Sequence, residues 1–106
     1  MGQKILPMGP DINRGVEEFR GTPGAVLVDV RTPQEYAEGH IPGSINVPLQ
    51  AIIKVEEAVP DKAVPIFVYC LSGARSRRAA AFFGKLGYMD VRNIGGISAY
   101  SGELTR

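Results

Sequence analysis

The sequence is sparing in the residues that build metal and disulfide sites. Among 106 residues it has one cysteine, one histidine and no tryptophan. A single cysteine rules out an internal disulfide framework, and one histidine with one cysteine cannot form a cluster with the spacing of a zinc site. The sequence therefore predicts neither a metal site nor any other cofactor.

Net charge and long apolar runs are also lacking. Twelve Lys and Arg residues against 11 Asp and Glu leave a formal charge of +1, which provides no overall field for nucleic acid or an anionic membrane. The apolar runs are a few residues long, far short of a bilayer span. Residues 1–10 have no continuous apolar core typical of a secretory signal. We therefore expect no nucleic acid or membrane partner, and a cytoplasmic location.

The length and composition are those of one folded unit. Hydrophobic residues make up 44% of the chain and charged residues 22%, which is an ordinary globular mixture. No internal repeat, low-complexity tract or linker interrupts it. We expect a single domain over residues 1–106.

The first strong pattern is a strand followed by a short helix. Residues 25–30 are apolar and β-branched, as in a buried central strand. Thr32 then suits an N-cap, Pro33 the first helical position, and Glu35 the third position of a capping box. The predicted helix ends near Gly39.

The same alternation continues along the chain. Residues 66–70 predict a second strand, and residues 77–86 a helix with Gly87 at its C′ position. Residues 91–94 predict another strand, and residues 98–104 a brief helical stretch. Further helix candidates cover residues 13–19 and 48–59. Alternating strands and helices favour an α/β fold, a parallel sheet with helices on both faces.

The segment after the second strand is suited to binding an anion. Ligands of such sheets collect at the carboxyl ends of the strands, where Cys70 stands. Gly73 allows a tight turn, so that backbone N–H groups and the free donors of the next helix can converge on negative charge. A thiolate fits there, since a helix N-terminus and a nearby arginine lower the pKa of a thiol. The predicted site comprises Cys70, Leu71, Ser72, Gly73, Ala74, Arg75 and Ser76.

Three arginines crowd the start of the predicted helix. Arg75, Arg77 and Arg78 lie where the helix dipole disfavours cations, which indicates a bound anion. Arg75, inside the loop, is the strongest candidate to contact it. Arg77 and Arg78 fit either an anion contact or a solvent-facing position.

Other polar residues near strand ends have structural as well as functional interpretations. His40 precedes a turn-forming Ile-Pro-Gly segment, where a hydrogen bond that fixes the turn explains it better than a catalytic role. Asp29 suits an acceptor that orients or braces the loop. Arg31 suits either a partner for a nearby acid or a positioning role at the site, and both alternatives stay open.

Taken together, the cysteine loop, residues 29–31 and residues 36–48 resemble the rhodanese homology domain. The resemblance extends over about residues 16–103. Two motifs carry it together: His-Ile-Pro-Gly after an aromatic residue, and a cysteine followed by an arginine after four intervening residues. It implies a sheet of about five parallel strands, Cys70 as the nucleophile, and loop amides around a persulfide. Tyr100 departs from the family pattern, in which tryptophan is common there.

The chemistry that the resemblance implies is sulfur transfer. A Cys70 thiolate, at a solvent-accessible position, would attack thiosulfate or a related anionic donor and become a persulfide. Cyanide, a thiol or a protein would then remove the outer sulfur. No second cysteine is needed, whereas a thioredoxin-like oxidoreductase normally has a Cys-x-x-Cys pair.

Two other functions share part of this pattern. A dual-specificity phosphatase also combines a loop cysteine with an arginine, but it has five intervening residues, against four between Cys70 and Arg75. A non-catalytic module that carries or senses sulfur for a protein partner would keep the same loop, so the sequence leaves that alternative open.

Overall fold

A central parallel sheet organises the molecule, as the sequence predicted. The computed structural model describes residues 10–106. Its sheet contains β1 (Val26–Asp29), β2 (Ser44–Asn46), β3 (Ile66–Cys70) and β4 (Val91–Gly96). The strand order is β2-β1-β3-β4 and every pairing is parallel. Cys70 is therefore the last residue of a central strand.

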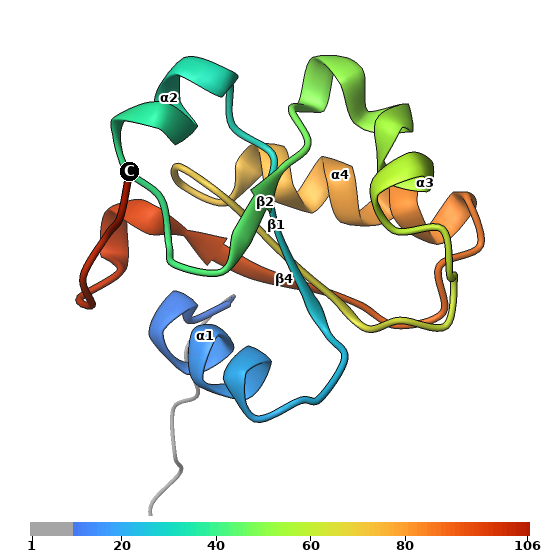
Figure 1. Cartoon of the computed structure of the whole chain (residues 1–106), viewed down its shortest axis with the longest axis horizontal. Coiled ribbons are helices and arrows are strands. Elements are labelled where there is room, and N and C mark those ends of the chain that lie inside the picture. The colour runs from blue at the N-terminus through green and yellow to red at the C-terminus, as the bar shows by residue number, and fades with distance from the viewer. Residues whose placement is uncertain (1–9) are drawn as a thin grey trace, which may run out of the picture.

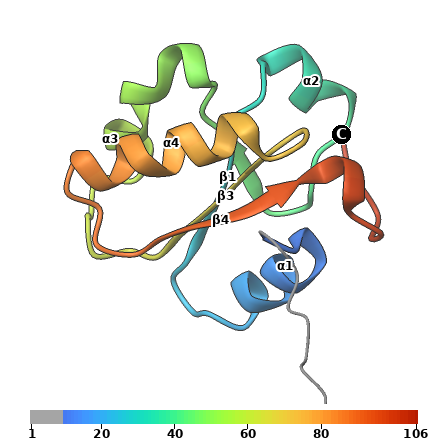
Figure 2. The ribbon, with the colours of Figure 1, turned by 180° about the vertical axis from the view of Figure 1, so that it is seen from behind.

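Helices cover both faces of this sheet (Figures 1 and 2). Helix α1 (Ile12–Arg20) covers one face, and α3 (Val55–Ala58) and α4 (Ala74–Lys85) lie on the other, with the 3-10 segment η1 (Leu49–Lys54) leading into α3. Short α2 (Pro33–Glu38) follows the carboxyl end of β1. Within residues 10–106, no helix combines the length and apolar character needed to cross a bilayer.

Alternation along the strands divides the apolar side chains between two cores. On β1 and β3, Leu27 and Phe67 face α1, whereas Val28 and Val68 face α4. All five residues of β3 are buried, as expected for a central strand covered on both sides. The Cys70 side chain belongs to the core on the α4 side.

Local signals at the helix ends are confirmed. The Thr32 side chain accepts from the Glu35 N–H and the Glu35 side chain accepts from the Thr32 N–H, which completes the predicted capping box of α2. Gly87, after α4, has φ of +100°, the left-handed conformation predicted for it.

Some predicted elements differ from the structure. About five strands were expected, but the described residues form four, and the pairing of His40 with Thr105 is only an isolated antiparallel bridge. The helical stretch predicted over residues 98–104 is wrong beyond the 3-10 segment η2 (Ile97–Ala99). Strand β2 was missed, because three residues at a sheet edge carry too little pattern.

Candidate active site

The cysteine loop is a short turn between β3 and α4. Gly73, with φ of +107°, stands at the N-cap position of α4, and no side chain caps the first turn. Gly96 lets the loop lie against β4, because a Cβ there would fall 2.6 Å from the Cα of Ser72. The backbone donors at the start of α4 are therefore free to turn toward Cys70.

Polar groups of the loop converge on the cysteine sulfur. The Gly73 N–H donates to Sγ of Cys70 at 3.0 Å, and the Cys70 thiol donates to the hydroxyl oxygen of Ser76 at 3.4 Å. Burial alone would raise the pKa of the thiol, but hydrogen bonds from the Ser76 hydroxyl and from the N–H groups of Ser76, Gly73 and Ser72 hold that pKa below its ordinary value. The loop thus favours the thiolate, and Ser76 contacts the sulfur through its hydroxyl.

The predicted solvent accessibility of this sulfur is wrong. The Cys70 side chain is 1% exposed and packs with Val30, Val47 and Ala79 in the core on the α4 side. Strand alternation explains this, because a β3 residue at this register must point toward one of two covered faces. The loop above it is open, since Leu71 is 44% exposed.

Arg75 is held by a partner that the sequence did not reveal. Its guanidinium forms a two-pronged ion pair with Glu35, with Nη1–Oε1 at 2.8 Å and Nη2–Oε2 at 3.0 Å. The hydrogen bond from Arg75 lowers the pKa of Glu35 to about 2. The same carboxylate accepts from the Thr32 N–H. Arg75 therefore ties the cysteine loop to the first turn of α2.

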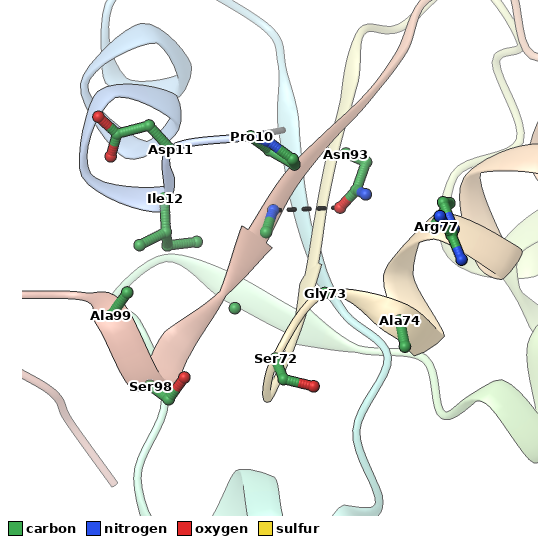
Figure 3. A pocket seen from close by; sticks show the side chains of 12 residues that line it. Pro10, Asp11, Ile12, Ser72, Gly73, Ala74, Arg77, Asn93, Ser98 and Ala99 are labelled. Carbon is green, nitrogen blue, oxygen red and sulfur yellow. Dashed lines mark hydrogen bonds between the residues drawn. The ribbon is translucent and has the colours of Figure 1, made fainter. Parts of the chain in front are cut away.

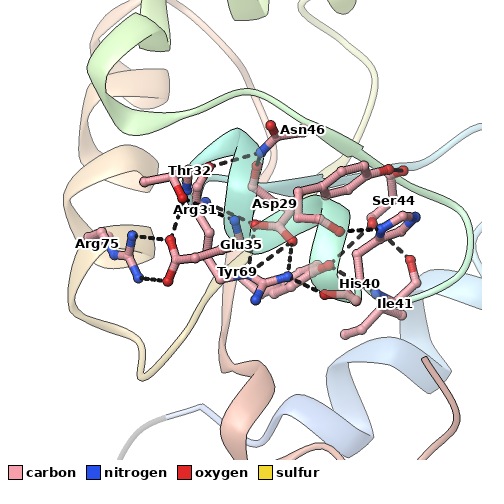
Figure 4. A network of polar contacts seen from close by, with 12 residues as sticks. Asp29, Arg31, Thr32, Glu35, His40, Ile41, Ser44, Asn46, Tyr69 and Arg75 are labelled. Carbon is pink, nitrogen blue, oxygen red and sulfur yellow. Dashed lines mark hydrogen bonds and ion pairs between the residues drawn. The ribbon is translucent and has the colours of Figure 1, made fainter. Parts of the chain in front are cut away.

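Asp29 and Arg31, at the carboxyl end of β1, form a buried ion pair (Figure 4). Asp29 is 0% exposed and Arg31 5%. Nη2 of Arg31 lies 2.8 Å from Oδ2 of Asp29 and also donates to the carbonyl oxygen of Gly39 at 2.7 Å. Of the two roles left open for Arg31, pairing with an acid is the one that the structure shows.

The polar residues that surround this pair fix the turn before β2. Nδ1 of His40 donates to the carbonyl oxygen of Tyr36 at 2.8 Å, and the two rings stack with centroids 3.6 Å apart. The hydroxyl of Tyr69 accepts from the Ile41 N–H and lies 3.1 Å from the hydroxyl of Ser44. His40 thus has the structural role that the sequence predicted.

A cavity of about 650 Å³ opens on the other side of the loop (Figure 3). Ser72, Gly73 and Ala74 line it from the loop, and Asn93 and Arg77 line it from β4 and α4. Arg77 is exposed there, as is Arg78 on the same turn. The structure thus places one of the two open arginines beside the loop.

These residues make a site for a negatively charged sulfur without a metal ligand set. In the part of the chain that the structure describes, no three or more His, Cys, Asp or Glu side chains are grouped to hold a metal ion. The loop instead supplies N–H groups and a hydroxyl beside the Cys70 thiol. Such an arrangement can stabilise a thiolate and a second anionic sulfur bonded to it.

Comparisons with known proteins agree with this geometry. Residues 14–103 match the family model for the Rhodanese-like domain. Thiosulfate sulfurtransferase PspE of Escherichia coli is 39% identical over 71 residues, covering 66% of this chain and 68% of that protein. A protein named Sulfurtransferase from Allochromatium vinosum is 44% identical over 87 residues, covering 80% and 79%.

Solved structures show the same likeness. A rhodanese with anions from E. coli superposes with a TM-score of 0.72 at 34% identity, over 77% of this chain and 98% of that one. The chain belongs to the rhodanese-like domain family. At the level of that family, it is a rhodanese-type sulfurtransferase.

Proposed function

We propose that the protein transfers sulfane sulfur from thiosulfate, or a related anionic donor, to a thiophilic acceptor through a persulfide on Cys70. The observation that carries the proposal is the Gly73 N–H that donates to Sγ at 3.0 Å, with the Ser76 hydroxyl in contact with the same sulfur at 3.4 Å. Donors placed around a sulfur stabilise negative charge on it. Relatives named thiosulfate sulfurtransferase support thiosulfate as the donor.

The proposed reaction has two displacement steps. In the first, the Cys70 thiolate attacks the outer sulfur of thiosulfate, the sulfur–sulfur bond of the donor breaks, and sulfite leaves with its electron pair. The product, Cys–S–S⁻, carries its charge on the outer sulfur. In the second step cyanide, a thiol or a protein cysteine attacks that outer sulfur, and the Cys70 thiolate leaves.

The loop residues have distinct proposed roles. The backbone N–H groups of Leu71, Ser72, Gly73, Ala74 and Arg75 are proposed to surround the outer sulfur, as in the family. The Cys70 side chain is 1% exposed, and the exposed Leu71 and Ser72 form the outer surface of the loop. We propose that the loop moves when a donor reaches the sulfur. We propose that the Arg75 side chain sets the loop position through Glu35.

The end of β1 supports the site rather than taking part in the chemistry. We propose that Asp29 and Arg31 position the carboxyl edge of the sheet, because each is engaged by the other within a buried pair. The proposed compartment is the cytoplasm, where thiols are kept reduced. A compartment of that kind suits the free thiol of Cys70.

A thiosulfate:cyanide assay tests the proposal. Thiocyanate should form with the wild-type protein and not with Cys70→Ser, which keeps a similar side chain but lacks the nucleophilic sulfur. Ser101→Ala, an exposed substitution close to the chain end, is the matched control and should keep wild-type turnover. Hydrolysis of an aryl phosphate without thiocyanate formation would instead indicate the phosphatase. Sulfur uptake from thiosulfate without turnover to cyanide or small thiols would indicate the carrier module.

A further inference from the structure

A buried chain of polar groups runs from the active-site sulfur to β4. Ser76 is 0% exposed, and its Oγ lies 3.4 Å from Sγ of Cys70 and 2.7 Å from Oδ1 of Asn93. Asn93 precedes the point where the pairing of β3 with β4 shifts register. Its carboxamide projects from β4 beside the cavity at the loop (Figure 3).

A backbone group fixes which way the Asn93 carboxamide faces. The N–H of Gly95 lies 3.1 Å from Oδ1 of Asn93 and donates to it. An N–H requires an acceptor, so this atom is the carbonyl oxygen and not the amide nitrogen. A carbonyl oxygen only accepts, and therefore the 2.7 Å contact requires the Ser76 hydroxyl to donate to Asn93.

The Ser76 hydroxyl has one proton and several acceptors. Its distances to the carbonyl oxygens of Gly73 and Gly95 are 3.1 and 3.4 Å, longer than the distance to Asn93. While the Ser76 hydroxyl donates to Asn93, its oxygen presents a lone pair to Cys70 and accepts a hydrogen bond from the thiol. To stabilise a thiolate, the hydroxyl must turn and donate to sulfur, which breaks its bond to Asn93.

We propose that Asn93 is a positioning residue that competes with the Cys70 sulfur for the Ser76 proton and thereby limits how readily the thiolate forms. The consequence for turnover rests on the proposed function, whereas the competition itself does not. Asn93 hydrogen-bonds to Ser76 and to the Gly95 N–H, and in this proposal it acts on the sulfur through Ser76. The proposal therefore predicts opposite effects of removing the two side chains.

Charged groups lie on the elements next to this chain of hydrogen bonds. Arg75 interacts electrostatically with Cys70, and its own charge is paired with Glu35. Arg77 lines the same cavity as Asn93, and Asp29 and Arg31 pair with one another at the end of β1. The substitutions below leave all of these in place, so a change in thiolate population reports on the Ser76 hydroxyl.

Ultraviolet absorbance of the thiolate, followed against pH, tests the proposal directly, because the chain has one cysteine. At a pH below the wild-type midpoint, Asn93→Ala should raise the thiolate fraction about threefold, the worth of one neutral hydrogen bond. Ser76→Ala should lower it about tenfold, the worth of one hydrogen bond to a charged group. A purely structural role predicts loss of thiolate in both.

Two further variants protect the test against misfolding. Asn93→Ser keeps a hydroxyl that can accept from the Gly95 N–H two residues on, but it is too short to reach Ser76. It should raise the thiolate fraction as Asn93→Ala does. Asn46→Ala removes a comparable carboxamide that donates to the carbonyl oxygens of Asp29 and Arg31, and it should leave the thiolate fraction unchanged.

A double variant completes the design. Ser76→Ala with Asn93→Ser should titrate like Ser76→Ala alone, since Asn93 acts only through Ser76. A folded Asn93→Ser protein whose thiolate fraction equals or falls below that of the wild type overturns the proposal. The titration involves no sulfur transfer. Failure of the wild-type protein to take up sulfur would therefore overturn the proposed function and leave this inference standing.

Discussion

Two neighbouring strands of one sheet end in opposite ways. At the end of β1, the carboxylate of Asp29 and the guanidinium of Arg31 satisfy one another and are closed off from solvent. At the end of β3, backbone donors point at a single sulfur that carries no fixed charge. Each charge of a buried ion pair depends on the other, so removing one costs stability, whereas donors around an uncharged sulfur can stabilise a charge that forms during a reaction. Substitutions should therefore separate activity from stability.

The largest effect is expected at the end of β3. Cys70→Ser should lower thiosulfate turnover by at least about a thousandfold, because no other nucleophile can accept the sulfur. The free energy of unfolding should change by only about 1 kcal/mol, since the serine oxygen can accept from the Gly73 N–H. Urea denaturation and the cyanide assay measure the two quantities. A large loss of stability would erase the contrast between the strand ends.

The end of β1 should respond in the opposite sense. Asp29→Ala leaves the Arg31 charge buried without its carboxylate, and we expect a loss of about 3–5 kcal/mol in the free energy of unfolding. Replacing both residues, as Asp29→Leu with Arg31→Met, should restore most of that loss. Urea denaturation of the single and double variants decides this. An unstable double variant would show that Asp29 and Arg31 stabilise the fold through contacts other than the ion pair between them.

A smaller effect is expected where β4 supports the loop. In Gly96→Ala the new Cβ would fall 2.6 Å from the Cα of Ser72, so the loop must shift, at about 1–3 kcal/mol. Turnover should fall with it, because the Gly73 N–H would move from the sulfur. Gly84→Ala, on α4 with no neighbour within 4 Å of its Cβ, is the matched control. Normal turnover in Gly96→Ala would contradict the required loop position.

The smallest combined effect on stability and activity is expected from the ion pair that ties the loop to α2. Arg75→Ala and Glu35→Gln should each cost about 1 kcal/mol, typical of a partly exposed pair, and each should reduce kcat/KM about tenfold by loosening the loop. Double-mutant analysis should show that the two effects do not add. Unchanged kcat/KM in Arg75→Ala would show that Arg75 does not set the position of the loop.

The ion pair of Arg75 with Glu35 should make the free energy of unfolding fall at acid pH. The pKa of Glu35 is lowered from 4.5 to about 2 by its hydrogen bond with Arg75. The stability from this carboxylate is therefore present above pH 4.5 and is lost as the pH falls toward about 2. Glu35→Gln should lack that part of the acid response. If the free energy of unfolding falls equally with decreasing pH in the wild type and in Glu35→Gln, the Glu35 carboxylate does not pair with Arg75 in solution.

Local sequence signals predicted most of the architecture. The β-branched runs at β1 and β3 and the capping box at Thr32 depend on neighbours along the chain, and the structure shows each of them. The loop from Cys70 to Ser76 was predicted for the same reason. Contacts that depend on topology were missed. Glu35 and Arg75 are 40 residues apart, and the burial of Cys70 follows from which sheet face its register selects.

Intact-protein mass spectrometry after incubation with thiosulfate tests the central claim most directly. The wild-type protein should gain the mass of one sulfur atom, and cyanide should remove it, because Cys70 is the single cysteine. Ser76→Ala should gain less at the same pH, and Cys70→Ser should gain none. A wild-type protein that stays at its original mass, or a Cys70→Ser protein that gains sulfur, would contradict the persulfide at Cys70.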